Sequence, residues 1–436
     1  MKSIHQRILF GLIIGCAMIV TSPVNSQGTK GAAKTKPNAK TKMAGTRSSS
    51  TEAPAGIGEF SSDNFQLRTD LSAEDAKELL GRLEKMLVLV SKYYGKPNSQ
   101  TIEMNVVRDK NRWPPGSIPD AAIPSILDEG GITLSVTLAR QNDLGEKQIT
   151  AAKSIVWAVS ERGVPQHEAV HAFCHQNFGR TGPTWYSEGM AELGLYWREK
   201  NDSILIHDEV LAYLKSSEPK SLTEITAPGQ QTGDSWRNYA WRWALCHLLS
   251  TNPNYSTRFK PLGMALLNGH HTSFEDVYGS MAKEISFEYV FFLKHLDQGY
   301  RSDLCAWDWK TKFQRLRGSA TAQAKVVANR GWQASRVLMK AGDKISFSTT
   351  GDWFLEKDGL KIGPDGDDRH RGQLVGILFH DYQLSEPFDL GSSGEYEAPT
   401  EGNLFLRCRD DWNEISDNSG TVNVKFKTAH HLPPVM

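Results

Sequence analysis

The sequence lacks a charge excess, a compact set of cysteines and, after residue 26, any apolar run long enough to cross a membrane. Fifty Lys and Arg side chains balance fifty Asp and Glu side chains, which argues against nucleic acid as a partner. The five cysteines are scattered, so they predict neither a disulfide framework nor the CxxC pairs of a structural zinc site. A chain of 436 residues without these features is typical of a globular protein with two or three domains.

Residues 1–26 predict a signal peptide. Lys2 and Arg7 precede an apolar run over residues 8–20, and small residues follow up to Ser26. The run is about 13 residues long, too short to span a bilayer comfortably. Cys16 lies in a stretch similar to a lipoprotein cleavage box, which leaves lipidation as an alternative to simple secretion. We therefore expect a secreted, periplasmic or cell-surface protein.

Three further regions follow the signal peptide. Residues 27–62 are rich in Gly, Ala, Lys, Thr and Ser, so we predict a disordered linker. Residues 63–316 combine a capped amphipathic helix, short strand patterns and later helical patterns, which predicts an α+β domain. From residue 317 to 436, short strand patterns broken by Gly, Asp and Asn predict an all-β jelly-roll or sandwich domain.

The segment VPQHEAVHAF carries the strongest chemical signal. His167 and His171 are four residues apart, so on a helix both imidazoles face one metal ion. Glu168 points about 100° away from His167 and can reach a water held by that ion. Glu188, 17 residues after His171, is a candidate third ligand near the start of the next predicted helix. Glu192, one turn later, can hydrogen-bond a ligand histidine and fix its tautomer.

The His-Glu-x-x-His segment, followed by Trp-x-x-Glu-Gly-x-Ala-Glu, resembles the gluzincin metallopeptidases, most closely the peptidase-MA-like domains of secreted bacterial proteins. The resemblance implies a zincin-like fold, a Zn²⁺ ion held by His167, His171 and Glu188, and a protein or peptide substrate. It also implies that Glu168 is the catalytic base. Only these two helical segments carry specific motifs.

Two secondary features bear on catalysis. The developing oxyanion needs a donor besides the zinc ion, and Tyr239 and His247 lie on one side of a later predicted helix. Each is a candidate oxyanion donor, although either residue type is more often part of a core. The run KSIVWAVS predicts an edge strand that could pair with an extended peptide substrate.

The C-terminal region contains a cluster of oxygen ligands. Asp410, Asp411, Asp417 and Asn418 lie within nine positions, a composition that suits calcium. Residues of about 330–427 resemble bacterial galactophilic lectins of the galactose-binding jelly-roll type, most specifically in the stretch DNSG. The resemblance implies Ca²⁺ bound by Asp410, Asp417 and Asn418, with backbone carbonyls completing the shell.

The same resemblance implies sugar contacts in another loop. The stretch GPDGDDRH and the following Gln373 match the sugar-contacting loop of these lectins, so His370 and Gln373 are candidate partners of sugar hydroxyls. The alternative is a sandwich that binds calcium for stability, or no metal at all, and only packs on the preceding domain.

Together these features predict a secreted zinc metallopeptidase that its C-terminal module directs to glycans or cell-envelope polysaccharide. Nucleic acid is not an expected partner, and the mature chain is expected to lack a transmembrane segment. Two alternatives remain open. One is a non-catalytic glycan-binding or adhesion protein on a degenerate peptidase scaffold, and the other is a zinc amidase that acts on cell-wall peptides.

Overall fold

The computed structural model describes residues 17–19, 56–141, 147–161, 163–197, 206–227 and 236–429. Cys16, the predicted signal peptide other than 17–19, and most of the predicted linker lie outside these residues. The chain forms two compact units, Met1–Thr181 and Gly182–Met436. Among the residues described, we find no helix with the length and hydrophobicity that a bilayer crossing requires.

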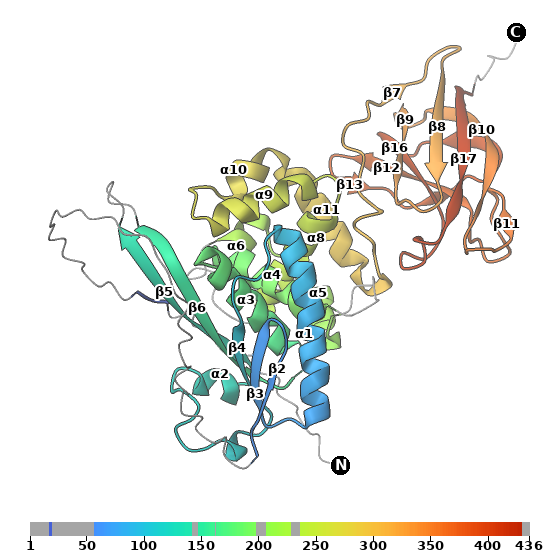
Figure 1. The fold of residues 1–436 in the computed structure, drawn as a ribbon. Helices are drawn as coiled ribbons and strands as arrows, with labels where there is room; N and C mark the ends of the chain where they lie inside the picture. Colours follow the sequence, from blue (N-terminus) through green and yellow to red (C-terminus); the bar gives the residue numbers. More distant parts are fainter. Residues whose placement is uncertain are drawn as a thin grey trace, which may run out of the picture. The chain divides into compact units, whose positions relative to one another are not determined.

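A mixed sheet forms the base of the first unit (Figure 1). Strands β6, β4 and β3 run parallel, whereas β5 is antiparallel to β6 and β2 is antiparallel to β3. β1 runs parallel to β5. β2 lies in the predicted linker, and its pairing with β3 means that the folded region begins before residue 63. The spatial order is β1 (Ala17–Ile19), β5 (Gly131–Gln141), β6 (Lys147–Val159), β4 (Ile102–Val107), β3 (Phe65–Thr69) and β2 (Gly58–Ser61).

The predicted edge strand is not at the edge. KSIVWAVS belongs to β6, which is hydrogen-bonded to β4 on one side and to β5 on the other. The prediction was wrong because an alternating apolar pattern reports burial of a face and contains no information on lateral neighbours. β5 lies outside β6, and its residues Ser135, Val136 and Thr137 pair with the three residues of β1.

Helices α1 (Ala73–Tyr94) and α3 (Val164–Phe178) pack against the sheet and against each other. α1 is the capped amphipathic helix that the sequence predicts in residues 63–316. The Ser72 side chain accepts a hydrogen bond from the Asp75 backbone N–H at 3.1 Å, and Gly95 ends the helix at a φ of 69°. The connection from β4 to β5 contains the 3₁₀ helix η1 (Lys110–Arg112) and the short helix α2 (Ile123–Leu127).

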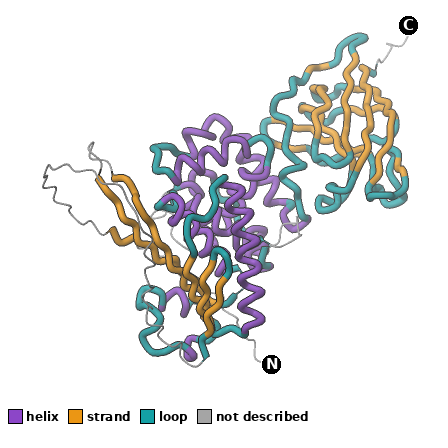
Figure 2. The backbone as a smooth tube through the Cα atoms, in the orientation of Figure 1, coloured by secondary structure: helices purple, strands orange, loops and turns teal. Residues whose placement is uncertain are grey.

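The first part of the second unit is helical (Figure 2). The α-helices among its described residues are α4 (Thr184–Tyr196), α5 (Asp208–Ser216), α6 (Leu222–Thr226), α8 (Trp236–Thr251), α9 (Ser256–Leu267), α10 (Phe274–Tyr278) and α11 (Ala282–Lys294). The 3₁₀ helices η2 (Gly279–Met281) and η3 (Leu296–Gln298) flank α11. α4 and α8 are in close contact, because Gly189 on α4 lies directly against the α8 backbone.

Replacing Gly189 by alanine should destabilise this helix pair. An added Cβ would lie 2.7 Å from the carbonyl oxygen of Arg242 and would also overlap the Cys246 sulfur. We expect a loss of about 1–3 kcal/mol, measured as a lower Tm in thermal unfolding. Gly81→Ala is the matched control, because a Cβ at that exposed position of α1 meets nothing within 4 Å. It should stabilise the chain by up to about 1 kcal/mol, and equal Tm shifts in both variants would contradict the packing argument.

Two sheets form the rest of the second unit. The first has the order β11 (Lys361–Ile362), β10 (Lys344–Phe354), β17 (Ser419–Thr428) and β8 (Thr321–Val327), and β15 (Ser393–Glu397) also pairs with β10. The second has the order β13 (Gln383–Leu384), β12 (Leu374–His380), β16 (Gly402–Cys408), β9 (Gln333–Met339) and β7 (Gln314–Arg315), and β14 (Phe388–Asp389) also pairs with β12.

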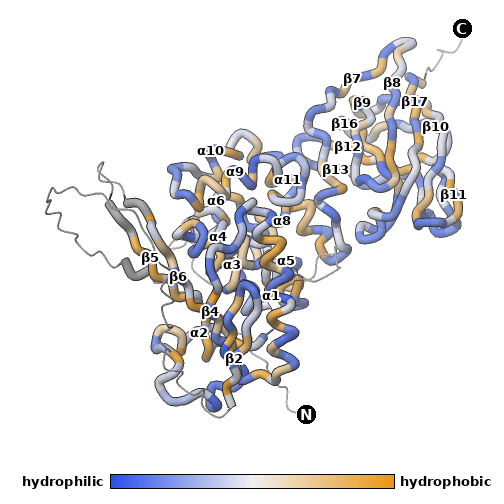
Figure 3. Tube along the Cα trace, in the orientation of Figure 1, coloured by the Kyte–Doolittle hydropathy of each residue, from blue (hydrophilic) through white to orange (hydrophobic). Residues whose placement is uncertain are grey.

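The two sheets share one apolar core. Buried residues alternate with exposed ones along β8 and β17, and Figure 3 shows mixed hydropathy along both strands. The core includes Ala324 and Val424 from one sheet and Leu378 and Leu404 from the other. The predicted combination of an α+β region with a following all-β region is confirmed at this level, whereas the boundary between 316 and 317 and the jelly-roll class remain predictions.

Aromatic side chains join α11 to the sheets within the second unit. The ring of Phe287 lies 5.2 Å from that of Phe379, and Trp307 lies 4.7 Å from Phe405. The buried carboxylate of Glu288 accepts hydrogen bonds from Tyr255 at 2.7 Å and from the Trp309 indole at 2.7 Å. Apolar rings and a satisfied buried carboxylate therefore fix the segment that leads from α11 into the sheets.

Cysteines contribute to the core as thiols. Cys174, Cys246, Cys305 and Cys408 are free and buried. Burial raises the pKa of Cys174 and of Cys305 to about 12. These thiols are therefore protonated at neutral pH and pack as small apolar side chains, which makes them poor nucleophiles.

Candidate metal centre

Helix α3 is buried almost throughout, yet much of its surface is polar. Gly163 precedes it, Pro165 lies in its first turn, and Gly179 ends it at a φ of 73°. A fully buried helix is normally apolar all round. Here His167, Glu168 and His171 are all at most 5% exposed. Buried polar residues in such number are informative, because each must have a partner or a ligand.

Three of the predicted ligands come together. His167 and His171 on α3 and Glu188 on α4 each offer one ligand atom, and these atoms all lie within 4.8 Å of one another. The two Nε2 atoms of the histidines are 3.1 Å apart. Around a tetrahedral zinc ion with Zn–N bonds of about 2.0–2.1 Å, two ligand nitrogens are separated by about 3.3 Å. The two imidazoles therefore fit a zinc ion in both chemistry and spacing, and Glu188 adds a carboxylate oxygen within 4.8 Å of them.

Glu168 lies against strand β5. Its Oε2 accepts a hydrogen bond of 2.7 Å from the Thr133 hydroxyl, which also lies 3.0 Å from the Glu168 backbone oxygen. A Cβ added at Gly131 would lie 2.7 Å from Cγ of Glu168. Thr133 thus holds the carboxylate, and the missing side chain at Gly131 makes room for it.

Sequence reasoning missed both Gly131 and Thr133. Their segment, GITLSVTLA, is one of the short strand patterns expected in residues 63–316, and it lies in β5. The alternation along that strand indicates which side chains share a face, but a period of two contains no information about the helix that packs there. The local signal for this contact is the pair Gly131 and Thr133, a small residue and a hydroxyl on the same face of the strand.

Of the other residues predicted near the metal, Glu192 and Tyr239 are buried and His247 is partly buried. Glu192 lies one turn after Glu188 on α4, and Tyr239 lies on α8. His247, also on α8, has its ring 5.6 Å from Trp243 and stacked on Phe292 at 5.5 Å. Burial lowers the pKa of His247 to about 4. It is therefore neutral at pH 7, and the roles of Glu192, Tyr239 and His247 at the metal remain predictions.

Two of the three predicted calcium ligands are buried. Within the described chain, Asp410 Oδ2 and Asn418 Oδ1 accept no hydrogen bond, whereas Asp410 Oδ1 accepts one from the Asp411 backbone N–H at 3.0 Å. Asp417 is exposed. Burial raises the pKa of Asp410. Buried oxygens without a donor are what a hard cation satisfies, so Asp410 and Asn418 fit calcium.

The loop predicted to contact sugar lies beside this cluster. Gly372 N–H donates to the Arg409 carbonyl at 2.7 Å, and Arg409 N–H donates to the Gln373 carbonyl at 2.8 Å. Exposed His370 has a left-handed φ of 60°. Asp367 fixes this turn, because its Oδ1 accepts the backbone N–H groups of Arg369 and Arg371, each at 2.9 Å.

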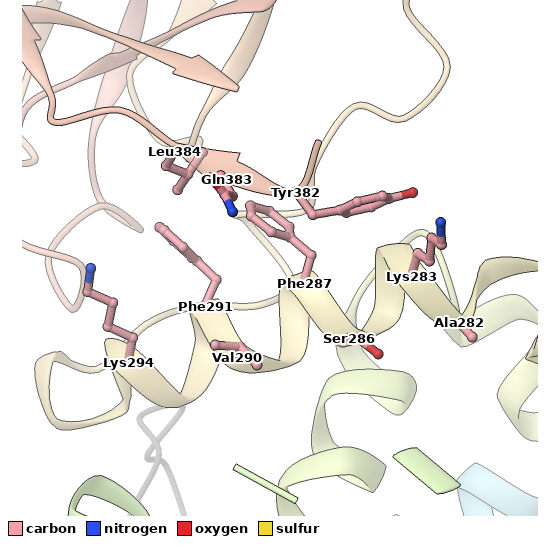
Figure 4. Close-up of a pocket in the computed structure, with 10 residues that line it drawn as sticks. All are labelled: Ala282, Lys283, Ser286, Phe287, Val290, Phe291, Lys294, Tyr382, Gln383 and Leu384. Atoms are coloured by element: carbon pink, nitrogen blue, oxygen red, sulfur yellow. The ribbon is translucent and has the colours of Figure 1, made fainter. Parts of the chain in front are cut away.

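A cavity of about 850 Å³ lies elsewhere in the second unit (Figure 4). It is formed by α11 and the β12–β13 turn, where Phe287, Val290 and Tyr382 line it. None of the predicted catalytic, metal or sugar-binding residues lines this cavity, and no sequence pattern indicated it.

No protein-family model and no curated protein match the chain. Among solved structures, the chain is similar to the EclA N-terminal domain, a PllA-like lectin, with 22% identity and a TM-score of 0.22 over 25% of this chain and 96% of that chain. It is similar to the IMPa metallopeptidase of Pseudomonas aeruginosa, with 10% identity and a TM-score of 0.18 over 84% of this chain and 46% of that chain.

IMPa in complex with an O-glycopeptide is a further similar structure, with 12% identity and a TM-score of 0.17 over 53% of this chain and 24% of that chain. The chain thus covers less than half the length of either IMPa chain. TM-scores this low carry no argument about fold or function, so the function rests on the residues themselves.

Proposed function

We propose that this protein is a zinc-dependent peptidase in which His167, His171 and Glu188 hold the ion. The proposal rests on one observation, the buried group of two imidazoles and one carboxylate whose ligand atoms lie within 4.8 Å of one another. Three protein ligands leave one position open on a tetrahedral ion, which is the arrangement of a catalytic rather than a structural zinc site.

A bound zinc ion would supply a Lewis acid that makes water reactive near neutral pH. Glu168 is the general base in this proposal. Its carboxylate takes a proton from the attacking water and then gives it to the leaving amine. The Thr133 hydroxyl, 2.7 Å from Oε2, keeps the carboxylate in one orientation during both transfers. The amide bond of a protein or peptide is the substrate class that this chemistry serves.

The experiment that tests this function is metal analysis of the purified chain combined with digestion of a peptide library. We expect stoichiometric zinc and peptide cleavage that a chelator abolishes and added zinc restores. A chain that binds no zinc would favour the non-catalytic alternative. Cleavage of peptidoglycan in place of peptides would favour the amidase.

Thr133→Val should weaken catalysis without weakening metal binding. The valine keeps the shape of the side chain but cannot donate to Glu168, and a hydrogen bond to a charged group is worth about 1.5–3 kcal/mol. We expect kcat to fall roughly ten- to a hundredfold with zinc content unchanged, and Tm to fall as well, because the buried carboxylate loses this donor. Thr133→Ser keeps the hydroxyl and should restore most of the rate. Equal rates for the valine and serine variants would remove Thr133 from the mechanism.

We also propose calcium-dependent glycan binding by residues 317–436. The support is the pair of buried oxygens on Asp410 and Asn418, which accept no hydrogen bond among the described residues. Asp417 and backbone carbonyls would complete the ion's shell, and His370 and Gln373 would contact the sugar. Calcium titration of the full chain followed by a glycan array, with and without chelator, tests this role. Retention on no glycan at any calcium concentration would reject it.

A further inference from the structure

Arg409 occupies the side-chain oxygen of Gln373 and leaves its NH₂ group available. Its Nη1 donates a hydrogen bond of 2.7 Å to the Gln373 side-chain oxygen, and its Nη2 is paired with Asp389. A guanidinium has donors and no acceptor, so the atom of Gln373 that faces it must be the oxygen. The assignment of the amide orientation therefore follows from the chemistry of the partner.

In this pair of Gln373 and Arg409, here called the clamp, the N–H groups that remain available to a ligand are donors, and the acceptor beside them is the Asp389 carboxylate. Gln373 retains its NH₂ group, and the parts of the Arg409 guanidinium that Gln373 and Asp389 do not engage are also N–H donors. Backbone pairing between Arg409 and the segment Gly372–Gln373 fixes both side chains beside Asp410, the next residue of the candidate calcium loop. Neutral sugar hydroxyls both donate and accept, whereas a carboxylate accepts only. The exposed edge of this clamp is therefore complementary to a carboxylate.

The surrounding carboxylates do not remove this preference. Asp367 is paired with Arg371 at 3.1 Å, and Asp410 would face the cation. Asp389 competes with a ligand carboxylate for Arg409, because its own carboxylate already pairs with the guanidinium. The Asp389 side chain is 50% exposed. An exposed ion pair contributes little stability, so a ligand carboxylate can share or replace Asp389 on the guanidinium.

We propose that Arg409 directs the glycan site toward acidic sugars, with a uronate in place of neutral galactose. This inference rests on the proposed glycan-binding function, since it concerns the specificity of that site. The carboxylate at C6 of the sugar would accept hydrogen bonds from Arg409 and from the Gln373 amide, while ring hydroxyls bind the calcium ion. Charge-assisted bidentate contacts of this kind are about twice as strong as neutral ones.

Methyl galactopyranoside and the methyl glycoside of galacturonic acid form a matched pair of probes that differ only at C6. Calorimetric titration of the full chain in saturating calcium should show the uronate binding at least about tenfold more tightly. Arg409→Asn removes the cation and frees the Gln373 oxygen, so the preference should disappear or reverse. Asp389→Asn removes the competing carboxylate, so the preference should increase several-fold.

Lys325→Asn is the control for loss of one positive charge, because Lys325 is exposed on β8 in the other sheet and should leave the ratio unchanged. Calcium affinity and Tm, measured on each variant, show whether it is folded. Equal or tighter binding of the neutral sugar by the parent chain would overturn the inference and leave glycan binding intact. If the chain bound neither of these sugars and no other glycan, the glycan function itself would be rejected.

Discussion

Glu168→Gln should hydrolyse peptides at least about a hundredfold more slowly than the parent chain while retaining its zinc. The glutamine has nearly the shape of the glutamate, and its amide oxygen can still accept the hydrogen bond that Thr133 donates at 2.7 Å. The pocket beside Gly131 is therefore preserved, and the only property lost is the ability to take and return a proton. Steady-state kinetics on a fluorogenic peptide, with elemental analysis of the same sample, checks both expectations.

Glu218→Gln is a suitable control for this variant, because it makes the same chemical change at an exposed position that is not part of the group His167, His171 and Glu188. It should behave like the parent chain in both measurements. If the Glu168 variant retained full activity, another group would have to be the base. If it lost zinc as well as activity, Glu168 would be needed to build the site, and its role in proton transfer would remain open.

Glu188→Ala should remove the metal. The two imidazoles on α3, with Nε2 atoms 3.1 Å apart, would then be the only remaining members of the group of three. Loss of a residue that merely supports a ligand costs 10–100-fold in metal affinity, so loss of a ligand should weaken zinc binding by more than about a hundredfold. Zinc content after dialysis and a competitive chelator titration measure this loss, and hydrolysis should fall with it.

The matched comparison is Glu192→Ala, one turn along the same helix and equally buried. As a supporting residue it should reduce zinc affinity by roughly 10–100-fold, clearly less than the loss of Glu188. Both variants remove a buried carboxylate from α4, so a general effect on packing would appear in both. Full retention of zinc by the Glu188 variant would end the assignment of this carboxylate as a ligand.

Local chemistry explains why several elements were predictable. Helix α1 depends on a serine cap, acidic residues in its first turn and a terminal glycine, all within one segment. Strands β4, β5 and β6 depend on short alternating patterns bounded by turn residues. The pair His167 and His171 depends only on helical periodicity, because residues four apart must share a face.

Other features depended on contacts between distant segments. The position of β6 inside the sheet requires knowledge of both neighbours, which is why the edge-strand prediction failed. The contact between Thr133 and Glu168 joins residues that are 35 positions apart, and the clamp between Gln373 and Arg409 joins residues that are 36 positions apart. The sequence around either residue of such a pair contains no information about which distant residue it will contact.

The sequence by itself determined the chemical groups of this protein: two histidines at helical spacing, a carboxylate between them, further carboxylates on a later helix, and a loop crowded with oxygen ligands. Periodicity and capping fix such features, because they act within a few residues of chain. The tertiary structure alone decided which groups meet. It brought Glu188 near the two histidines, Thr133 to Glu168 and Arg409 to Gln373, since only packing of distant segments sets distances between side chains across the fold.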